Sequence, residues 1–572
     1  MIPRRLLRYP MLVLSTLSLV LALSACSQAP ASTAPSAPAQ PAATSAPGAA
    51  APAPATAAPA AQPAAKSGAA PANTFIFGRG GDSVKLDPAV ITDGESHRVT
   101  AQILEELVDF DGQTTNVRPA LADSWTTSSD GKTWTFKLHP GIKFTDGTDF
   151  NSDAVVFNFQ RWMDTKNPYH KGGDFTYFHD MFGGFKNDPS ESTLVIDDVK
   201  AVDPLTVQFT LKAPQGPFLN NLAMFPFSIQ SPTAIKKDVD NLFKNPVGTG
   251  PFKFVEWIPD DHITLDKNPD YWDKANMPKL DRIIFRVIKD NTARFLELKA
   301  GTIHGMEGLN PDDVKAAQSD PNLKIQLRPA MNVAYLAFNF KTQPELAKKE
   351  VRQAIAYGIN RQAIVDALYA GTGQVASQFL PPSVWGFNPD VKPYPYDPEK
   401  AKQLLAQAGY PNGFSMELWY MPVSRPYYPN PKPIAEAFAA DLAKIGIKAD
   451  LKTEDWSLYT ADRKKGKFPF WMLGWTGDNG DPDNFLGVFF GTLDDENTWD
   501  NPQVRQMLKQ AQSTTDKAAR EKIYKDLAVI INDEMPRLPV ANTTPPLAFR
   551  KNVNGYVTNP TGTELYKTVS IQ

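Results

Sequence analysis

A stretch of low sequence complexity, residues 27–72, most constrains what this chain can fold into. It contains 22 Ala and 10 Pro in 46 positions, and Lys66 is its only charged residue. Such a segment has almost no side chains to bury, so burial cannot offset the entropy lost on ordering it. We therefore predict a disordered, extended tether. The hydrophobic core must form within residues 73–572, and the chain's apolar content of 42% is sufficient for a large one.

The segment before the tether has the features of a secretion signal. Three arginines lie within the first eight residues, and residues 11–23 form an uncharged, mostly apolar run of 13. A spanning helix needs about 20 such residues, whereas a signal peptide needs fewer. The following Leu23-Ser24-Ala25-Cys26 resembles a bacterial lipobox. The resemblance implies a lipoprotein signal peptide over 1–26, with lipid attached to Cys26; a free cysteine in an ordinary secreted leader is the alternative.

The cysteine count and the charge exclude several classes of protein. Cys26 is the only cysteine, which excludes a disulfide framework and a zinc site built from several thiolates. The net charge of the whole chain is -3, and it becomes -7 for residues 73–572 because four basic residues lie outside them. This balance gives no general attraction to nucleic acid, so we expect no nucleic-acid partner.

The residues after the tether change in pattern along the chain. Residues 133–138 alternate polar and apolar side chains, which predicts a half-buried strand, and 99–108 has the spacing of a helix. After about residue 330, helical patterns alternate with strands. Asp397-Pro398 and Asn360 have the positions of helix N-caps there. This alternation indicates an α/β fold.

Three common catalytic motifs are absent from the sequence. The sequence lacks Gly-x-Ser-x-Gly, His-Glu-x-x-His and a Walker A loop, and its six histidines never have the spacing of a helical metal site. His170 and His179 are interpreted as surface or packing residues. The acidic run 478–483 superficially resembles a calcium loop, but Gly480 and Pro482 occupy ligand positions, so a turn with Asx hydrogen bonds is favoured. We predict no catalytic residues, no metal and no cofactor.

Several stretches, in order along the chain, are similar to one protein family. Together they resemble the family 5 extracellular solute-binding proteins of ABC importers, and the resemblance covers essentially all of 73–572. The stretches are LADSW at 121–125, DGKTWTFKL at 130–138, GIKFTDG at 141–147, NPVGTGPF at 245–252, KNPDYW at 267–272 and YDPEKA at 396–401.

Two further stretches most closely resemble the periplasmic dipeptide-binding members of that family. They are WYMPVSRPY at 419–427 and GWTGDNGDPDNF at 474–485. The resemblance implies that Arg425 binds the α-carboxylate of a peptide and that Asp478 binds its α-ammonium. It also suggests Tyr427, Trp475, Thr476 and Gly477 as further ligand-binding residues, although packing is a comparable interpretation for Tyr427 and Trp475.

Elementary electrostatics gives the same pair of residue types. A free dipeptide is a zwitterion, and a site that encloses it must neutralise both ends because an unpaired buried charge is very unfavourable. The planar guanidinium of Arg425 suits a carboxylate, and the carboxylate of Asp478 accepts from an ammonium. The distance between them would then select ligands by length. Residues 92–98 are a candidate for a contribution from the first lobe, with loop packing as the alternative.

The resemblance also implies the fold, which is the α/β, two-lobed periplasmic-binding-protein fold of type II, cluster C. We expect lobe I over 73–330 plus 546–572, with an extra β-rich subdomain at about 110–245, and lobe II over 331–545. Two crossing strands would form the hinge, near residues 328–331 and 538–548.

The expected function is that of a binding subunit, not an enzyme. The lobes would close over a dipeptide or short peptide, and the closed form would dock on the transmembrane subunits of an ABC permease. We expect a monomer outside the cytoplasm, held on the bacterial membrane through Cys26. The same fold for another ligand (oligopeptide, glutathione, haem or a nickel complex) is the alternative, and an envelope hydrolase is a distant one.

Overall fold

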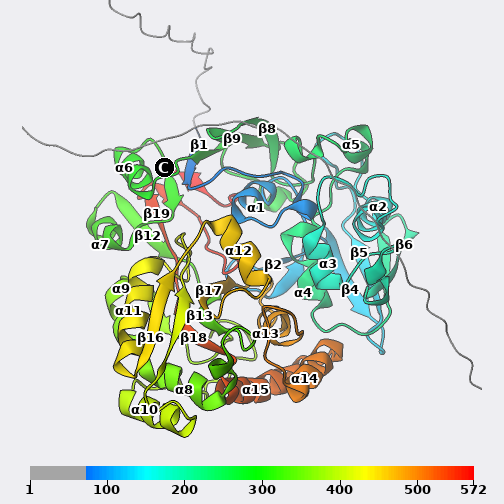
Figure 1. The fold of residues 1–572 in the computed structure, drawn as a ribbon. Helices are drawn as coiled ribbons and strands as arrows, with labels where there is room; N and C mark the ends of the chain where they lie inside the picture. Colours follow the sequence, from blue (N-terminus) through cyan, green and yellow to red (C-terminus); the bar gives the residue numbers. More distant parts are fainter. Residues whose placement is uncertain (1–72) are drawn as a thin grey trace, which may run out of the picture. The chain divides into compact units, whose positions relative to one another are not determined.

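The computed structural model describes residues 73–572, which lie within one compact unit. Figure 1 shows the arrangement of its helices and strands. The predictions for the leader, the tether and Cys26 fall on residues 1–72 and lie outside the described residues.

A seven-stranded mixed sheet joins the beginning of the described chain to its end. β1 is paired in parallel with β10 and β11, and β19, near the C-terminus, lies between β11 and β12. Buried Phe75, Phe77, Phe285 and Phe549 belong to the core of this sheet. In spatial order the strands are β12 (Leu323–Leu327), β19 (Pro546–Arg550), β11 (Gly305–Glu307), β1 (Thr74–Arg79), β10 (Arg282–Val287), β9 (His262–Lys267) and β8 (Phe252–Ile258).

A separate four-stranded antiparallel sheet lies in the segment between β1 and β8. The alternation predicted for 133–138 is confirmed, because β5 spans Thr133–Leu138 and buries Trp134, Phe136 and Leu138. Its core is rich in aromatic rings and includes residues of helix α2 (Ser152–Met163). In spatial order the strands are β4 (Ala122–Thr127), β5, β7 (Thr206–Leu211) and β6 (Ile196–Asp203); β2 (Val108–Phe110) and β3 (Val117–Pro119) form a small hairpin.

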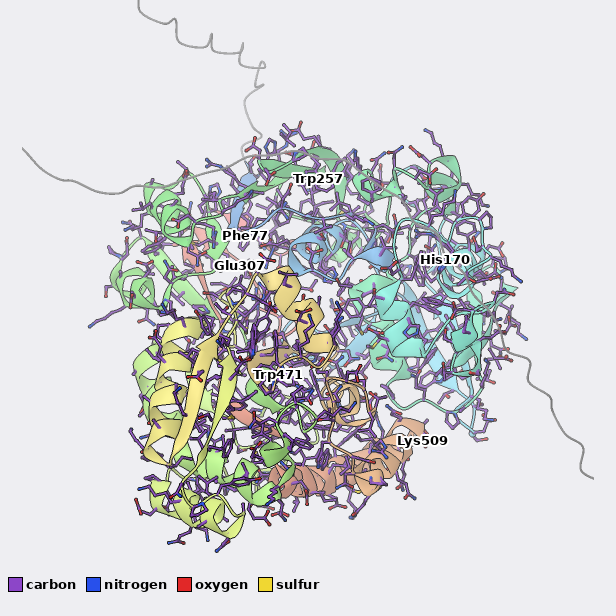
Figure 2. The ribbon with its side chains drawn as sticks, in the orientation of Figure 1. Phe77, His170, Trp257, Glu307, Trp471 and Lys509 are labelled. Atoms are coloured by element: carbon purple, nitrogen blue, oxygen red, sulfur yellow. The ribbon has the colours of Figure 1, made fainter. Side chains whose placement is uncertain are left out.

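A six-stranded sheet organises the second half of the chain. Its central strand β13 is buried at every position, and its neighbour β18 is buried throughout as well. Trp471, labelled in Figure 2, belongs to the same core. In spatial order the strands are β14 (Gly373–Val375), β18 (Arg537–Thr543), β13 (Asn332–Phe338), β17 (Phe470–Thr476), β15 (Phe414–Trp419) and β16 (Ile447–Lys452).

Helices pack around these sheets, and their predicted caps are confirmed. The side chain of Asp397 accepts from the backbone N–H of Lys400, and that of Asn360 accepts from Ala363. The helices in the second half of the chain are α8 (Lys349–Gly358), α9 (Arg361–Leu368), α10 (Pro398–Gln407), α11 (Pro431–Lys444), α12 (Trp456–Lys464), α13 (Asp483–Phe490), α14 (Pro502–Ser513) and α15 (Lys517–Glu534). Those in the first half are α1 (Gly94–Thr100), α2, α3 (Thr176–Phe182), α4 (Phe218–Leu222), α5 (Pro232–Lys237), α6 (Asn291–Ala300) and α7 (Pro311–Ser319); a final β pair joins β20 (Val553–Asn554) and β21 (Ser570–Ile571).

The helix predicted over 99–108 is wrong. Helix α1 spans Gly94–Thr100, because Asp93 caps it by accepting from the N–H of Ser96, and strand β2 begins at Val108. Ile103 and Leu107 are nevertheless buried. The spacing of Ile103 and Leu107 therefore indicates only that both are buried. The segment between α1 and β2 has an irregular conformation.

Two connections carry the chain between the seven-stranded and the six-stranded sheet. Residues 328–331 link β12 to β13, and residues 544–545 link β18 back to β19. The connections lie side by side, since the N–H of Arg328 donates to the carbonyl of Pro545 at 3.0 Å. The guanidinium of Arg328 also pairs with buried Glu564 at 2.6 Å, which ties the first connection to the C-terminal segment.

Candidate functional site

Two loops with the predicted ligand-binding residues leave the same edge of the six-stranded sheet. β15 and β17 are parallel neighbours, and Arg425 follows the end of β15 while Asp478 follows the end of β17. Parallel strands place their carboxyl ends at one edge, where open α/β sheets bind their ligands. The two connections between the sheets reach this edge too. Asn332 at the start of β13 pairs with Thr476 at the end of β17, and its side chain accepts from the N–H of Thr543 at the end of β18.

Arg425 lies in a tight turn and is half-buried. Its backbone N–H and carbonyl exchange hydrogen bonds with those of Tyr428, both at 3.0 Å. The guanidinium carbon lies 4.8 Å from the ring centroid of Trp456, the first residue of α12. This is a cation–π contact, which holds the side chain while it has no carboxylate partner among the described residues.

Tyr427 is fixed from both sides. The hydroxyl of Tyr369 donates to its carbonyl at 3.2 Å, and its ring packs on Gly474 of β17. A Cβ at position 474 would lie 2.2 Å from the Tyr427 ring, so only glycine permits this close approach. Burial raises the pKa of the Tyr427 hydroxyl to about 12, which keeps it neutral. Its position agrees with packing as well as with a place beside a ligand.

Asp478 is held by a network of hydrogen bonds centred on Asn484. The amide oxygen of Asn484 accepts from the N–H of Asp478 at 2.9 Å and from the indole of Trp475 at 3.2 Å. The amide nitrogen of Asn484 donates to Oδ2 of Asp478 at 3.0 Å. This network fixes the direction in which the Asp478 carboxylate points.

A tyrosine from another part of the chain completes the surroundings of Asp478. The hydroxyl of Tyr177, in α3, donates to Oδ1 of Asp478 at 3.1 Å. Burial raises the pKa of Asp478 to about 6, and the hydrogen bonds from Asn484 and Tyr177 oppose that shift. A carboxylate has about four lone-pair positions, so Asp478 retains capacity to accept from a cation.

Thr476 and Gly477 contribute backbone rather than side-chain chemistry. Thr476 is the last residue of β17, and the N–H of Gly477 donates to the carbonyl of Met331 at 2.8 Å. A Cβ at position 477 would lie 2.6 Å from the Phe485 ring. The glycine thus lets the chain turn toward Asp478 directly beside the first connection between the sheets.

The acidic run that resembles a calcium loop is a series of turns. The side chain of Asn479 accepts from the N–H of Asp481, and that of Asp481 accepts from the N–H of Asp483, both at 3.0 Å. Asp481 is fully buried and pairs with Arg520 at 2.7 Å. Within residues 73–572, no cluster of His, Cys, Asp or Glu has the arrangement of a metal site. His170, labelled in Figure 2, stacks on Phe175, with 4.2 Å between the centroids of the two rings. This is the contact of a packing residue.

The sequence did not reveal the partners that the first half of the chain supplies to Asp478 and to its neighbour Asn479. Besides Tyr177, Asn220 donates to the carbonyl of Asn479 at 2.9 Å, and Asn479 donates to the side chain of Asn221 at 2.7 Å. Tyr177 lies in the aromatic stretch between His170 and His179, but no local pattern signals a partner some 300 residues away. In the part of the chain that the structure describes, no hydrogen bond or ion pair joins Arg425 directly to Asp478.

Comparison with known proteins identifies the family. Residues 116–497 match the middle region of the bacterial extracellular solute-binding proteins, family 5. The chain belongs to this family. It is similar to the dipeptide-binding protein of Escherichia coli, at 37% identity over 88% of this chain and 95% of the relative. It is also similar to heme-binding protein A of Haemophilus influenzae, at 38% identity over 87% of this chain and 92% of the relative.

Solved structures show the same fold. HbpA2 from Haemophilus parasuis matches with a TM-score of 0.78 at 35% identity, covering 87% of this chain and all of that one. The periplasmic binding protein DppA from Helicobacter pylori, in complex with peptide STSA, matches with a TM-score of 0.75 at 33% identity over 87% and 98%. The expected two-lobed α/β periplasmic-binding-protein fold, with its additional β-rich subdomain and two-strand hinge, is therefore confirmed.

Membership of the family also gives the location and the general role. Family 5 proteins are extracellular solute-binding proteins, so this chain binds a solute outside the cytoplasm. Among residues 73–572, none of the helices has the length and apolar character needed to span a membrane.

Proposed function

We propose that this protein captures dipeptides or short peptides and delivers them to the transmembrane subunits of an ABC permease. The observation that supports this most directly is the pair Arg425 and Asp478, which follow neighbouring parallel strands at one sheet edge. The guanidinium would bind the ligand's α-carboxylate and Asp478 its α-ammonium. Tyr427 follows Arg425 by two residues, and Trp475, Thr476 and Gly477 directly precede Asp478, so we propose that these four residues form the wall of the site.

The mechanism requires two lobes that move about a hinge. We propose lobe I over 73–330 plus 546–572, with the subdomain at about 110–245, and lobe II over 331–545. Tyr177 already lies on Asp478 in this structure. Closure over a ligand would exclude water, and a lower local dielectric would strengthen both ion pairs with the ligand. No chemical step is needed for this role, so we propose a binding protein and not an enzyme.

The proposed attachment to the membrane is through lipid on Cys26, with residues 27–72 as the tether and a monomer as the working unit. Cys26→Ala should release the folded protein from the membrane fraction. Persistent membrane association of that variant would contradict lipid anchoring.

The ligand is tested by isothermal titration calorimetry with Ala-Ala. Asp478→Ala and Arg425→Ala should each weaken binding by about 2–5 kcal/mol, because each leaves a buried ligand charge unpaired. Asp198→Ala is the matched control, since Asp198 is an exposed carboxylate on β6. Unchanged affinity in either site variant would overturn the assignment of the site.

A second measurement tests the ligand class without assuming it. The similar relatives include proteins named for dipeptides, heme and glutathione. Mass spectrometry of small molecules released on denaturing the purified protein should show intact dipeptides or short peptides. Release of heme or glutathione instead would replace the proposed ligand while leaving the family assignment unchanged.

A further inference from the structure

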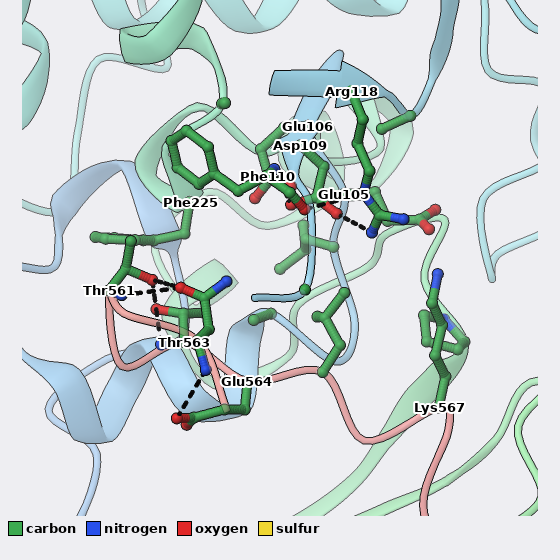
Figure 3. Close-up of a pocket in the computed structure, with 18 of the residues that line it drawn as sticks. Glu105, Glu106, Asp109, Phe110, Arg118, Phe225, Thr561, Thr563, Glu564 and Lys567 are labelled. Atoms are coloured by element: carbon green, nitrogen blue, oxygen red, sulfur yellow. Dashed lines mark hydrogen bonds and ion pairs between the residues drawn. The ribbon is translucent and has the colours of Figure 1, made fainter. Parts of the chain in front are cut away.

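A cavity of about 250 Å³ extends away from Asp478 into the first half of the molecule. Figure 3 shows it between the chain segment around Glu105 and Glu106, the hairpin β2–β3, and the C-terminal segment that includes Thr561 and Glu564. Asp478 forms part of its wall. The cavity therefore begins where the proposed ligand's ammonium would be bound.

Three of the carboxylates that line the cavity have cations close to them. Asp109 pairs with Arg118 at 2.6 Å, and Glu564 pairs with Arg328 at 2.6 Å. Glu105 accepts from Tyr271, Trp272 and Thr249, and the charge of Lys567 acts on it as well. Asp109 and Glu564 are thus ion-paired, whereas Glu105 has three hydrogen-bond donors and the charge of Lys567 nearby.

Glu106 differs from them. It is 9% exposed, and the hydroxyl of Ser228 donates to its Oε1 at 2.8 Å. Among the described residues, no lysine, arginine or histidine forms an ion pair with it. A buried carboxyl group beside an open cavity, without a counter-charge, is unfavourable for the free protein unless it stays neutral. Such a group is suited to a cation that arrives with a ligand.

We propose that this cavity receives the side chain of the ligand's first residue and favours lysine or arginine there, with Glu106 as the counter-charge. The proposal rests on the proposed function, because the ammonium bound to Asp478 fixes where the first residue lies. The first side chain leaves the carbon that carries this ammonium, so it starts beside the wall that Asp478 forms.

The size and the walls of the cavity agree with a long cationic side chain. A volume of 250 Å³ corresponds to about eight water molecules at ~30 Å³ each. Part of the cavity wall is apolar and is formed by Leu104, Phe110 and Phe225. Such a wall suits the aliphatic stem of lysine or arginine. The charged end would then reach Glu106 while the stem displaces water from these apolar surfaces.

The protonation of Glu106 gives this proposal a distinctive signature. Burial, together with the negative charges of Asp109 and Glu105, raises the pKa of Glu106 to about 8, and the hydrogen bond from Ser228 opposes this. Arg118 faces the same region but is paired with Asp109. At pH 7 Glu106 is thus mainly protonated, and it must release a proton when a lysine side chain binds. The preference for lysine should grow as the pH rises from 6.5 to 8.

The experiment compares Ala-Ala, Lys-Ala, Met-Ala and Ala-Lys by calorimetry with the full-length protein. Met-Ala matches the length of Lys-Ala without the charge, and Ala-Lys has the charge at the other residue. At pH 8 we expect Lys-Ala to bind about tenfold more tightly than Met-Ala. At pH 7, titrations in buffers of different ionisation enthalpy should show proton release for Lys-Ala beyond that for Met-Ala.

Glu106→Gln should bring the affinity ratio of Lys-Ala to Met-Ala close to one, whereas Asp198→Asn on β6 should keep the wild-type ratio. Equal affinities for Lys-Ala and Met-Ala in the wild-type protein, with Ala-Ala bound, would overturn this inference alone. Failure of all four peptides to bind would overturn the proposed function instead. If Glu106→Gln does not fold, the proton release by the wild-type protein still decides the proposal.

Discussion

The two ends of the proposed site are built differently. Asp478 is fixed by Asn484 and Tyr177, with hydrogen bonds of 3.0 and 3.1 Å to its two carboxylate oxygens. Arg425 is half-buried in a turn, and a contact with the ring of Trp456 holds its guanidinium. The acidic end is therefore preorganised, whereas the guanidinium at the basic end can shift along the surface of the Trp456 ring. Recognition of the ligand's ammonium should therefore be stricter than recognition of its carboxylate.

The largest expected effect comes from blocking the ligand's ends one at a time. N-acetyl-Ala-Ala should lose about 2–5 kcal/mol of binding free energy, because it leaves the fixed Asp478 carboxylate unpaired. Ala-Ala amide should lose less, since Arg425 can remain on Trp456. Calorimetry with the three peptides measures both losses. A greater loss for the amide than for the acetylated peptide would show that the Arg425 end of the site is the stricter one.

Asp478 should reduce the stability of the unliganded protein. Its pKa of about 6 lies above the usual pKa of an aspartate, which is about 4. At pH values above about 4, ionisation of Asp478 is therefore less favourable in the folded protein than in the unfolded chain, and this lowers the free energy of unfolding. At pH 7.5, Asp478→Asn should increase the free energy of unfolding by up to about 2 kcal/mol, and this gain should vanish near pH 4. Denaturant unfolding at the two pH values measures it, and a loss of stability at pH 7.5 would contradict the prediction.

The same pKa gives dipeptide binding a pH dependence. Protonated Asp478 cannot attract an ammonium, so affinity for Ala-Ala should fall as the pH drops through 6, by about tenfold at pH 5. The ligand's carboxylate remains ionised in this range, so the carboxylate end of the ligand does not contribute to the change. Calorimetry between pH 5 and 7.5 tests this. A constant affinity across that range would mean that Asp478 is not the ammonium partner.

The smallest effect is expected at Tyr177. Tyr177→Phe removes one hydrogen bond to Asp478 and keeps the ring that packs on Phe225, so binding should weaken by about 0.5–1.5 kcal/mol. Tyr169→Phe is the matched control, because the Tyr169 ring packs on Phe157 in the same half of the chain. Equal effects of the two substitutions would show that the Tyr177 hydroxyl does not contribute to the preorganised end.

Much of the secondary structure followed from the sequence, and the failures have a common cause. Strand β5 and the caps at Asp397 and Asn360 were predicted because their signals are local: alternation in one case, a side-chain oxygen beside free N–H groups in the others. The helix over 99–108 failed because Ile103 and Leu107 are buried by distant parts of the chain. Apolar spacing cannot separate a helix from an irregular segment that packs in the same core.

The sequence by itself determined the family, and it predicted the residue types that would suit a zwitterion. It also singled out Arg425 and Asp478 through the two stretches that contain them. Only the tertiary structure decided that these residues follow neighbouring parallel strands, that Tyr177 lies on Asp478, and that a cavity lined by Glu106 begins there. The physical reason is range: caps, turns and alternation act over a few residues, whereas counter-charges and cavities arise from segments hundreds of residues apart that only packing brings together.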